Sequence, residues 1–159
     1  VMQTIGQQGL ATWQNRNLNE VTPFWRGQLL GLGISPDEVD QVVLKLRDCV
    51  ERTLQHPKLE WLLSGNCQFE LPLSVVVDGV VEHRVLDVLR VEGDRAWVVD
   101  YKTSVPLDGE SVQEFVTREV ANYRKVMDAY CEAVRGMGHG EVGSGLFFLG
   151  VGEWVSLDM

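Results

Sequence analysis

Residues 80–103 read VVEHRVLDVLRVEGDRAWVVDYKT, two runs rich in valine, leucine and tryptophan on either side of Glu92-Gly93-Asp94. Apolar runs joined by a short polar connection predict a β-hairpin, because a glycine can adopt the positive φ that tight turns require. Strand side chains alternate between the two faces of a sheet, so Asp100 and Lys102 are expected on one face and Val99 and Tyr101 on the other.

A pair of carboxylates is expected in this hairpin. Asp87 lies on the first run and comes beside Asp100 on the second if the register allows. Two carboxylates about 4 Å apart near a protein surface repel each other by roughly 4 kcal/mol. A fold that holds them together usually needs a proton or a cation between them. The natural cation is a hard divalent ion with oxygen ligands.

Length and composition indicate one globular domain. The chain has 159 residues, of which 45% are hydrophobic and 23% charged, as in soluble proteins. No apolar run is long enough to span a bilayer and no signal peptide is recognisable, so the cytoplasm is the expected compartment and no membrane partner is expected. Cys49, Cys67 and Cys131 are scattered without a C-x-x-C pair, which argues against disulfides or a zinc site.

The first 65 residues carry helical patterns. Helices are expected over residues 2–14 with interruptions at Gly6 and Gly9, from an N-cap at Thr22 to Leu30, from a Ser35/Glu38 capping box to Leu54, and from His56-Pro57 to Leu63. His56 is expected to form a local hydrogen bond before the proline. Because the chain opens on Val1 directly with helix-like sequence, it resembles an excised fragment.

Strand patterns dominate from residue 66. A strand is expected over 67–77, closed by the turn Asp78-Gly79, and further strands over 146–149 and 154–157. Between them, a Ser111/Glu114 capping box opens a helix to about Arg135. The glycines between 136 and 145 are expected to form a flexible connection, and they lack the spacing of a nucleotide-binding loop.

The expected fold class is α/β, with a mixed central sheet flanked by helices. It forms a single domain with a helical part over 1–65 and a sheet-containing core over 66–159.

The hairpin also carries a resemblance to a known family. An acidic strand residue, a hairpin and Asp-x-Lys on the next strand resemble the PD-(D/E)XK nuclease superfamily. The fuller pattern, Val-Leu-Asp at 85–87 followed by Val-Val-Asp-Tyr-Lys-Thr at 98–103, resembles the RecB/AddA-type nuclease domain at the C-terminus of UvrD/Rep-like helicases. The resemblance implies a restriction-endonuclease-like core, excised from a larger helicase-nuclease.

The resemblance also implies an activity and its residues. The activity is metal-dependent hydrolysis of DNA phosphodiesters by an exonuclease that serves double-strand break repair and recombination. Asp87 and Asp100 would hold Mg²⁺ or Mn²⁺ together with the backbone carbonyl of Tyr101, and Lys102 would activate or position water. The implied partners are single-stranded DNA ends delivered by a helicase, the rest of the parent chain and a second subunit.

Three further residues have possible supporting roles, and two features depart from the family. Glu70 precedes a short hydrophobic stretch as in relatives, and is equally well an exposed strand carboxylate. Tyr123 and Tyr130 match tyrosines of the family's helix motif, and are equally well core aromatics. Val126 stands where relatives have glutamine, and no residue matches the family's metal-binding histidine, which favours reduced activity.

The net charge of −9 is unusual for a protein that grips DNA by itself, because phosphate neutralisation by basic residues supplies most non-specific affinity. Weak autonomous DNA binding is therefore expected. Two alternative functions stay open: a catalytically degenerate nuclease fold that acts as a DNA-binding or protein-interaction scaffold, and an interaction domain with no role in nucleic-acid chemistry.

Overall fold

The computed structural model describes residues 1–157, which form a set of helices followed by a five-stranded sheet. The helices before the sheet are α1 (Met2–Gln8), α2 (Leu10–Gln14), the 3₁₀ helix η1 (Leu18–Glu20), α3 (Thr22–Gly31), α4 (Val39–Leu54) and α5 (Pro57–Leu63). They are followed by β1 (Asn66–Val77), β2 (Val80–Glu92), β3 (Arg95–Lys102), α6 (Val112–Gly136), β4 (Glu141–Phe148) and β5 (Glu153–Ser156).

The sheet is mixed, with the strand order β1-β2-β3-β4-β5. β3 and β4 are parallel, and the other neighbours are antiparallel. Parallel neighbours need a long crossover connection, and α6 provides it. The expected α/β class with a mixed central sheet flanked by helices is confirmed.

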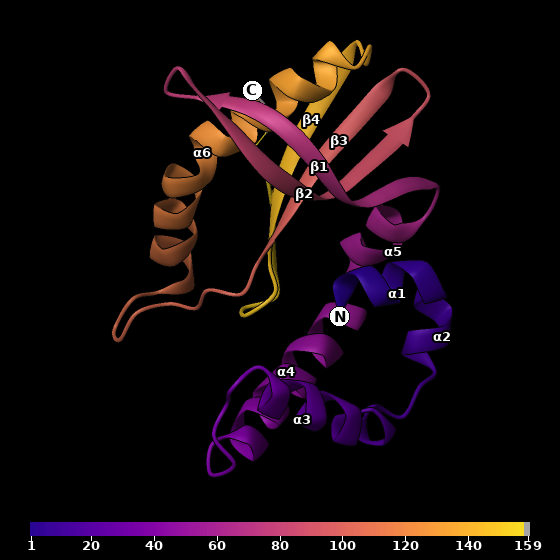
Figure 1. Ribbon diagram of the computed structural model, residues 1–159, viewed down its shortest axis with the longest axis vertical. Coiled ribbons are helices and arrows are strands. Elements are labelled where there is room, and N and C mark those ends of the chain that lie inside the picture. Colours follow the sequence, from indigo (N-terminus) through magenta and orange to yellow (C-terminus); the bar gives the residue numbers. More distant parts are fainter. Residues whose placement is uncertain (158–159) are drawn as a thin grey trace.

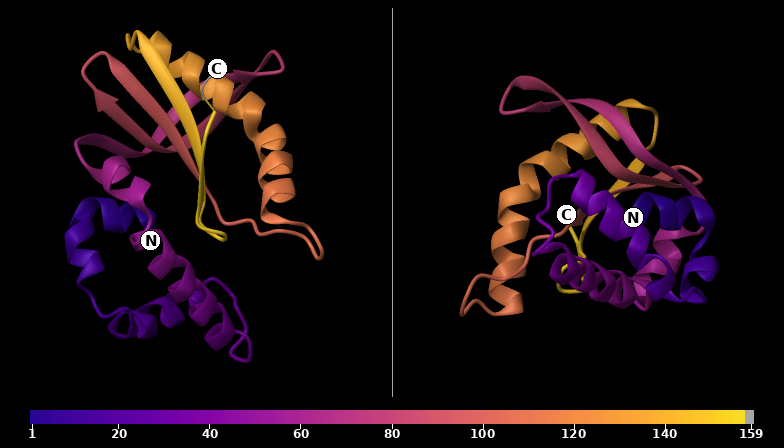
Figure 2. Two further views of the ribbon diagram at one scale, coloured as in Figure 1. Left: turned by 180° about the vertical axis from the view of Figure 1, so that it is seen from behind. Right: turned by 60° about the horizontal axis from the view of Figure 1, so that its bottom comes forward.

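Each face of the sheet has its own hydrophobic core. Phe115 and Met127 of α6 pack with Leu86, Val98 and Phe148 on one face. The other face packs against the N-terminal helices, and its buried members include Ile5, Leu59, Leu62, Val99 and Phe147. Figures 1 and 2 show α6 along one side of the sheet, with α1–α4 gathered below it and α5 between them.

The turn and cap signals around the sheet are confirmed. Asp78 and Gly79 both have positive φ, at 51° and 79°, as a two-residue type I′ hairpin turn requires. Gly93 closes the second hairpin with a φ of 64°. Ser111 and Glu114 form the expected reciprocal capping box at the start of α6. Local sequence therefore determines both hairpins and the start of the crossover helix.

Three expectations about the N-terminal helices were wrong. Thr22 lies inside α3, where its hydroxyl donates to the Asn19 carbonyl oxygen at 2.9 Å, and the N-cap is Val21. The Ser35 hydroxyl donates to the Glu38 carboxylate instead of accepting from a helix N–H, so no capping box forms and α4 begins at Val39. Only Gly9 interrupts the first helical segment, whereas Gly6 stays within α1.

The expectation of a flexible glycine connection over 136–145 was also wrong in part, because β4 begins at Glu141 and contains Gly143 and Gly145. Gly145 lies against the indole of Trp154, where an added Cβ would come within 2.3 Å of the ring. A glycine inside a strand often marks such a close approach. The glycine therefore serves packing between β4 and β5 rather than flexibility.

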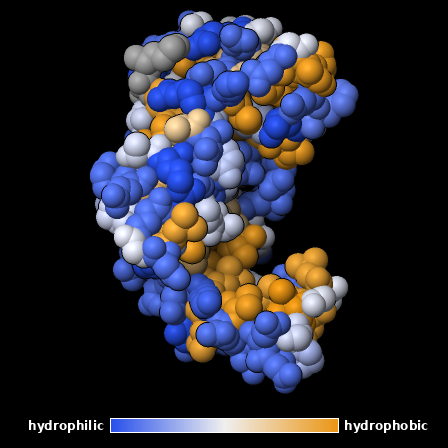
Figure 3. Space-filling model, turned by 90° about the vertical axis from the view of Figure 1, so that its left-hand side faces the viewer, coloured by the Kyte–Doolittle hydropathy of each residue, from blue (hydrophilic) through white to orange (hydrophobic). Residues whose placement is uncertain are grey.

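Hydrophobic residues gather around a hollow in the lower half of the molecule (Figure 3), where α3 and α4 lie. Phe24, Leu32 and Leu44 on this part of the chain are 63%, 81% and 51% exposed. Within residues 1–157, no helix combines the length and the apolar character that crossing a bilayer requires.

We predict that Gly6→Ala destabilises the protein. A Cβ at Gly6 would lie 2.3 Å from the Phe69 ring, and overpacking of this kind costs about 1–3 kcal/mol. Gly27→Ala in α3 is the matched control, because a Cβ there meets no atom within 4 Å and the helix gains up to about 1 kcal/mol. The free energy of unfolding from urea titration checks both; a neutral Gly6→Ala would contradict the packing of α1 on β1.

Candidate functional site

The candidate site lies where β2 and β3 separate. The ladder between them ends at the pair Val88 and Val99, and one step further along the same register Asp87 stands opposite Asp100. The backbone N–H of Tyr101 donates to the Asp87 carboxylate at 2.6 Å. A charge-assisted hydrogen bond of this kind contributes about 1.5–3 kcal/mol. The Asp87 side chain thus holds β3 where the backbone ladder has ended.

The sheet changes face at the same point. Phe69 on β1 and Val88 on β2 contact the core beneath the N-terminal helices, whereas their neighbours two residues away, Leu71 and Leu86, contact the core beneath α6. Simple alternation would place residues two apart on one face. The switch occurs at Glu70 and Asp87, which stand opposite each other and are skipped by the ladder.

Glu70 is the residue that carries the distortion. It has a φ of 54°, which costs a non-glycine residue on the order of 1–3 kcal/mol and is typical of functional sites. Its side chain is exposed, as one of the two readings of the sequence expected. Its carboxylate is close enough to Asp87 to raise the pKa of that residue.

Asp87 is the electrostatic centre of the site. Burial raises the pKa of its carboxyl to about 6, the nearby carboxylates of Asp100 and Glu70 add to the rise, and the Tyr101 N–H and Lys102 oppose it. The like charges are therefore close, as the sequence predicted. A carboxyl with this pKa is partly protonated near neutral pH, which is one of the two ways to relieve such repulsion.

Asp100 and Lys102 face α6, on the side opposite to Val99 and Tyr101, as alternation predicted. Asp100 is 7% exposed and forms an ion pair with the Lys102 ammonium. That ammonium also lies 3.7 Å from the centroid of the Tyr123 ring on α6. A cation over an aromatic face is attracted by the ring's quadrupole, so Tyr123 and Asp100 together fix the position of Lys102.

Tyr130 is a core aromatic with a polar contact. It is 3% exposed, and its hydroxyl donates to the Val85 carbonyl oxygen at 3.1 Å. Burial raises its pKa to about 12, with a further contribution from the Asp100 carboxylate. Val126 packs half-buried against the α6 core.

A pocket of about 380 Å³ opens beside Asp87 on the face of the N-terminal helices. Glu70, Asp87 and Tyr101 form its polar wall, and Cys49 and Val50 of α4 belong to its apolar wall. Burial raises the pKa of the Tyr101 hydroxyl, which has no hydrogen-bond partner among residues 1–157. Water or a ligand in this pocket would reach Asp87 directly.

The donor set of this site fits a hard divalent cation in its chemistry. Two carboxylates lie close enough for their charges to interact, Asp87 has a raised pKa, and oxygen ligands are what Mg²⁺ and Mn²⁺ prefer. Among residues 1–157, no group of three or more His, Cys, Asp or Glu side chains is arranged to hold a metal ion. An ion here would therefore draw on Asp87, Asp100 and backbone or solvent oxygens.

The remaining candidates lie outside the site. His83 pairs with the Ser74 hydroxyl at 3.0 Å on the exposed hairpin. His56 caps α5 by accepting from the Lys58 N–H, as expected. Within residues 1–157, Cys49, Cys67 and Cys131 form no disulfide.

Sequence reasoning missed two contributors. Arg84 lies close enough to Asp100 and Tyr130 for both to raise its pKa, although its hydrogen bond to Glu82 is the larger cause. Arg84 lies two residues before Leu86, which faces α6, so strand alternation could have indicated that Arg84 lies on the same face. The second missed contributor is α4, which forms one wall of the pocket beside Asp87. No local sequence pattern could predict this wall, because it depends on how the helix packs on the rest of the protein.

No family model matches the chain, and no curated protein matches it in sequence.

We predict that Asp87→Asn stabilises the metal-free protein above pH 6. Because the folded-state pKa of Asp87 lies above its unfolded value, the wild type is favoured at low pH and loses stability as Asp87 ionises between about pH 4 and 6. Asparagine keeps an acceptor for the Tyr101 N–H and removes that penalty. Because solvent screens this partly exposed group, the gain is roughly 1 kcal/mol at pH 7.5.

The measurement is thermal unfolding with EDTA at pH 4.5 and pH 7.5. Asp108→Asn in the exposed loop before α6 is the control for the loss of one negative charge. Equal effects of Asp87→Asn at both pH values would contradict the raised pKa.

Proposed function

We propose that this protein is a metal-dependent deoxyribonuclease that hydrolyses DNA phosphodiesters as an exonuclease. The observation that supports it best is the meeting of Asp87 and Asp100 at the end of the β2–β3 ladder, with Lys102 on the same strand as Asp100. This arrangement is the one that the resemblance to the PD-(D/E)XK superfamily calls for. The mixed sheet with a crossover helix is compatible with a restriction-endonuclease-like core.

In this proposal Asp87, Asp100 and the Tyr101 carbonyl oxygen hold Mg²⁺ or Mn²⁺. A bound ion of this kind polarises the scissile phosphate and lowers the pKa of coordinated water. The raised pKa of Asp87 means that this carboxyl gives up its proton when the ion binds, so metal affinity increases with pH through about pH 6.

Lys102 supplies the positive charge of the site. Its ammonium is held by Asp100 and the Tyr123 ring, and it would orient the attacking water and offset the negative charge that develops on the phosphate. Because the ion pair engages Asp100, metal binding requires that carboxylate to be shared between the ion and Lys102. The Tyr123 ring would keep Lys102 in place if Asp100 served as a metal ligand.

We further propose that the domain works within an ATP-dependent helicase-nuclease in double-strand break repair and recombination. The net charge of −9 favours a substrate that is delivered rather than captured, since general affinity for DNA comes from basic residues. The helicase part of the parent chain and a second subunit would supply single-stranded ends.

A second candidate function is a catalytically degenerate nuclease fold that serves as a DNA-binding or protein-interaction scaffold. It is favoured by the ion pair between Asp100 and Lys102, which neutralises a proposed ligand, and by Val126 at the glutamine position. The two functions differ in metal binding, because a scaffold needs no divalent ion at Asp87 and Asp100.

We predict that the wild type binds Mn²⁺ and cleaves end-labelled single-stranded DNA, and that Asp100→Asn weakens Mn²⁺ binding and abolishes cleavage. Losing an outer-shell partner costs 10- to 100-fold in metal affinity, so losing a direct ligand should cost at least about tenfold. Calorimetry measures Mn²⁺ affinity, and gel analysis of the labelled strand measures cleavage. Asp108→Asn is again the matched control and should behave as wild type.

Lys102→Ala separates chemistry from binding. It removes a charge that acts on the substrate and leaves both carboxylates, so Mn²⁺ binding should persist or tighten while the cleavage rate falls by about a hundredfold or more. A folded wild type that neither binds Mn²⁺ nor cleaves DNA would favour the scaffold function instead.

A further inference from the structure

An acidic nuclease domain needs a local surface that tolerates phosphate, and charge is unevenly distributed along this chain. Residues 1–65 contain six Lys or Arg and seven Asp or Glu, whereas residues 66–159 contain eight and sixteen. Nearly all of the excess negative charge therefore belongs to the sheet-containing part. A phosphate-bearing ligand is repelled least by the N-terminal helices.

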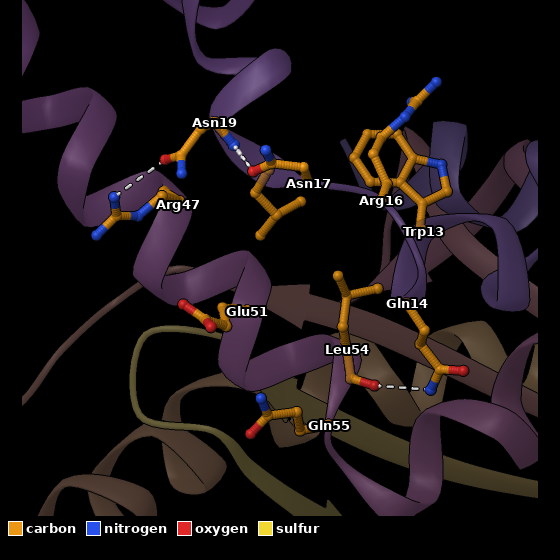
Figure 4. A pocket seen from close by; sticks show the side chains of 10 residues that line it. Trp13, Gln14, Arg16, Asn17, Asn19, Arg47, Glu51, Leu54 and Gln55 are labelled. Carbon is orange, nitrogen blue, oxygen red and sulfur yellow. Dashed lines mark hydrogen bonds between the residues drawn. The ribbon is translucent and has the colours of Figure 1, made fainter.

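A groove of about 610 Å³ lies on these helices, between the α2–η1 segment and α4 (Figure 4). Its volume is in the range of pockets that hold small-molecule ligands. The groove is lined by two positive side chains, Arg16 and Arg47, and one negative one, Glu51. The surplus of positive charge contrasts with the net charge of the whole protein.

Both arginines are available to a phosphate. The Arg16 guanidinium lies 4.9 Å from the Trp13 ring centroid, and within residues 1–157 it has no carboxylate partner. Arg47 pairs with Asp48 at 3.0 Å and reaches Asn19 at 3.4 Å. The Asp48 side chain is 58% exposed, and an exposed ion pair of this kind is weak and easily exchanged.

The rest of the lining suits nucleobases. Gln14, Asn17, Asn19 and Gln55 contribute amide groups, which carry both donors and acceptors and so match the edges of bases. Leu54 adds an apolar surface between them. The Gln14 amide donates to the Leu54 carbonyl oxygen at 3.0 Å, which fixes α2 against the end of α4 (Figure 4).

The groove and the candidate metal site share α4. Cys49, Val50 and Thr53 line the pocket beside Asp87, whereas Arg47, Glu51 and Leu54 line the groove. A helix with its side chains is about 10 Å across, so a strand held in the groove lies within a few nucleotides of Asp87. A stacked duplex cannot insert its bases into such a groove, but an unpaired strand can.

We infer that this groove binds one or two nucleotides of single-stranded DNA, with Arg16 and Arg47 on phosphates and the amides on base edges. The choice of DNA as the ligand rests on the proposed function. The groove lies on the side of α4 that faces α2 and η1, and it supplies a contact for DNA that the acidic sheet lacks. Binding requires no metal ion, so it is separable from cleavage.

The test is the fluorescence anisotropy of a labelled oligothymidylate in EDTA at increasing NaCl concentrations. Wild type should bind with an affinity that falls with salt, and Arg16→Ala and Arg47→Ala should each weaken binding about three- to tenfold and reduce the salt slope by about 0.7. Arg16→Lys, which keeps the charge, should retain part of the affinity. Arg26→Ala is the matched control, since Arg26 lies on α3 outside the groove and pairs with exposed Asp40.

Asp100→Asn separates this inference from the proposed function. If the groove is the contact, this variant binds the oligothymidylate as wild type does, whether or not wild type cleaves DNA with Mn²⁺. No binding by wild type, equal binding by the Arg16 and Arg47 variants, or equal competition by duplex DNA would overturn the inference. Equal competition by polyglutamate would also overturn it, because the groove would then be a general anion site.

Discussion

The hydrogen bond from the Tyr101 N–H to the Asp87 carboxylate is the constraint on which the candidate site depends. Where β2 and β3 separate, the backbone N–H of Tyr101 needs an acceptor in place of the lost ladder partner, and the Asp87 side chain provides it. The contact lies where Asp87 stands beside Asp100, and burial together with the neighbouring carboxylates raises the pKa of Asp87. The Asp87 side chain therefore both holds β3 in place and belongs to the candidate metal site.

The change of face at Glu70 and Asp87 explains why the site is reached from two directions. One part of the β1–β2 hairpin packs on α6 and the other on the N-terminal helices, so residues at the switch belong to neither core. Asp100, Lys102 and Tyr123 approach from the α6 side, whereas Glu70 and the pocket lie toward α4. A site at such a junction can receive a substrate from one side while its charges are fixed from the other.

The two halves of the chain differ in charge. The sheet-containing part concentrates carboxylates, which suit a cation and repel DNA, whereas the nearly neutral helical part presents arginines and amides in a groove. α4 contributes to both surfaces, because Cys49, Val50 and Thr53 line the pocket beside Asp87 and Arg47, Glu51 and Leu54 line the groove. A single helix thus lies between the proposed metal site and the proposed strand-binding groove.

The sequence by itself determined the hairpins and the long crossover helix, because turns, caps and strand alternation depend on neighbours in the chain; the register that sets Asp87 near Asp100 came from the structure. It also determined that Lys102 shares a face with Asp100. Only the tertiary structure decided the switch of face at Glu70, the place of Tyr123 beneath Lys102 and the strand at Gly143–Gly145. These features depend on contacts between segments distant in sequence, such as the packing of Trp154 on Gly145 and of α6 on the hairpin, and local propensity cannot specify such contacts.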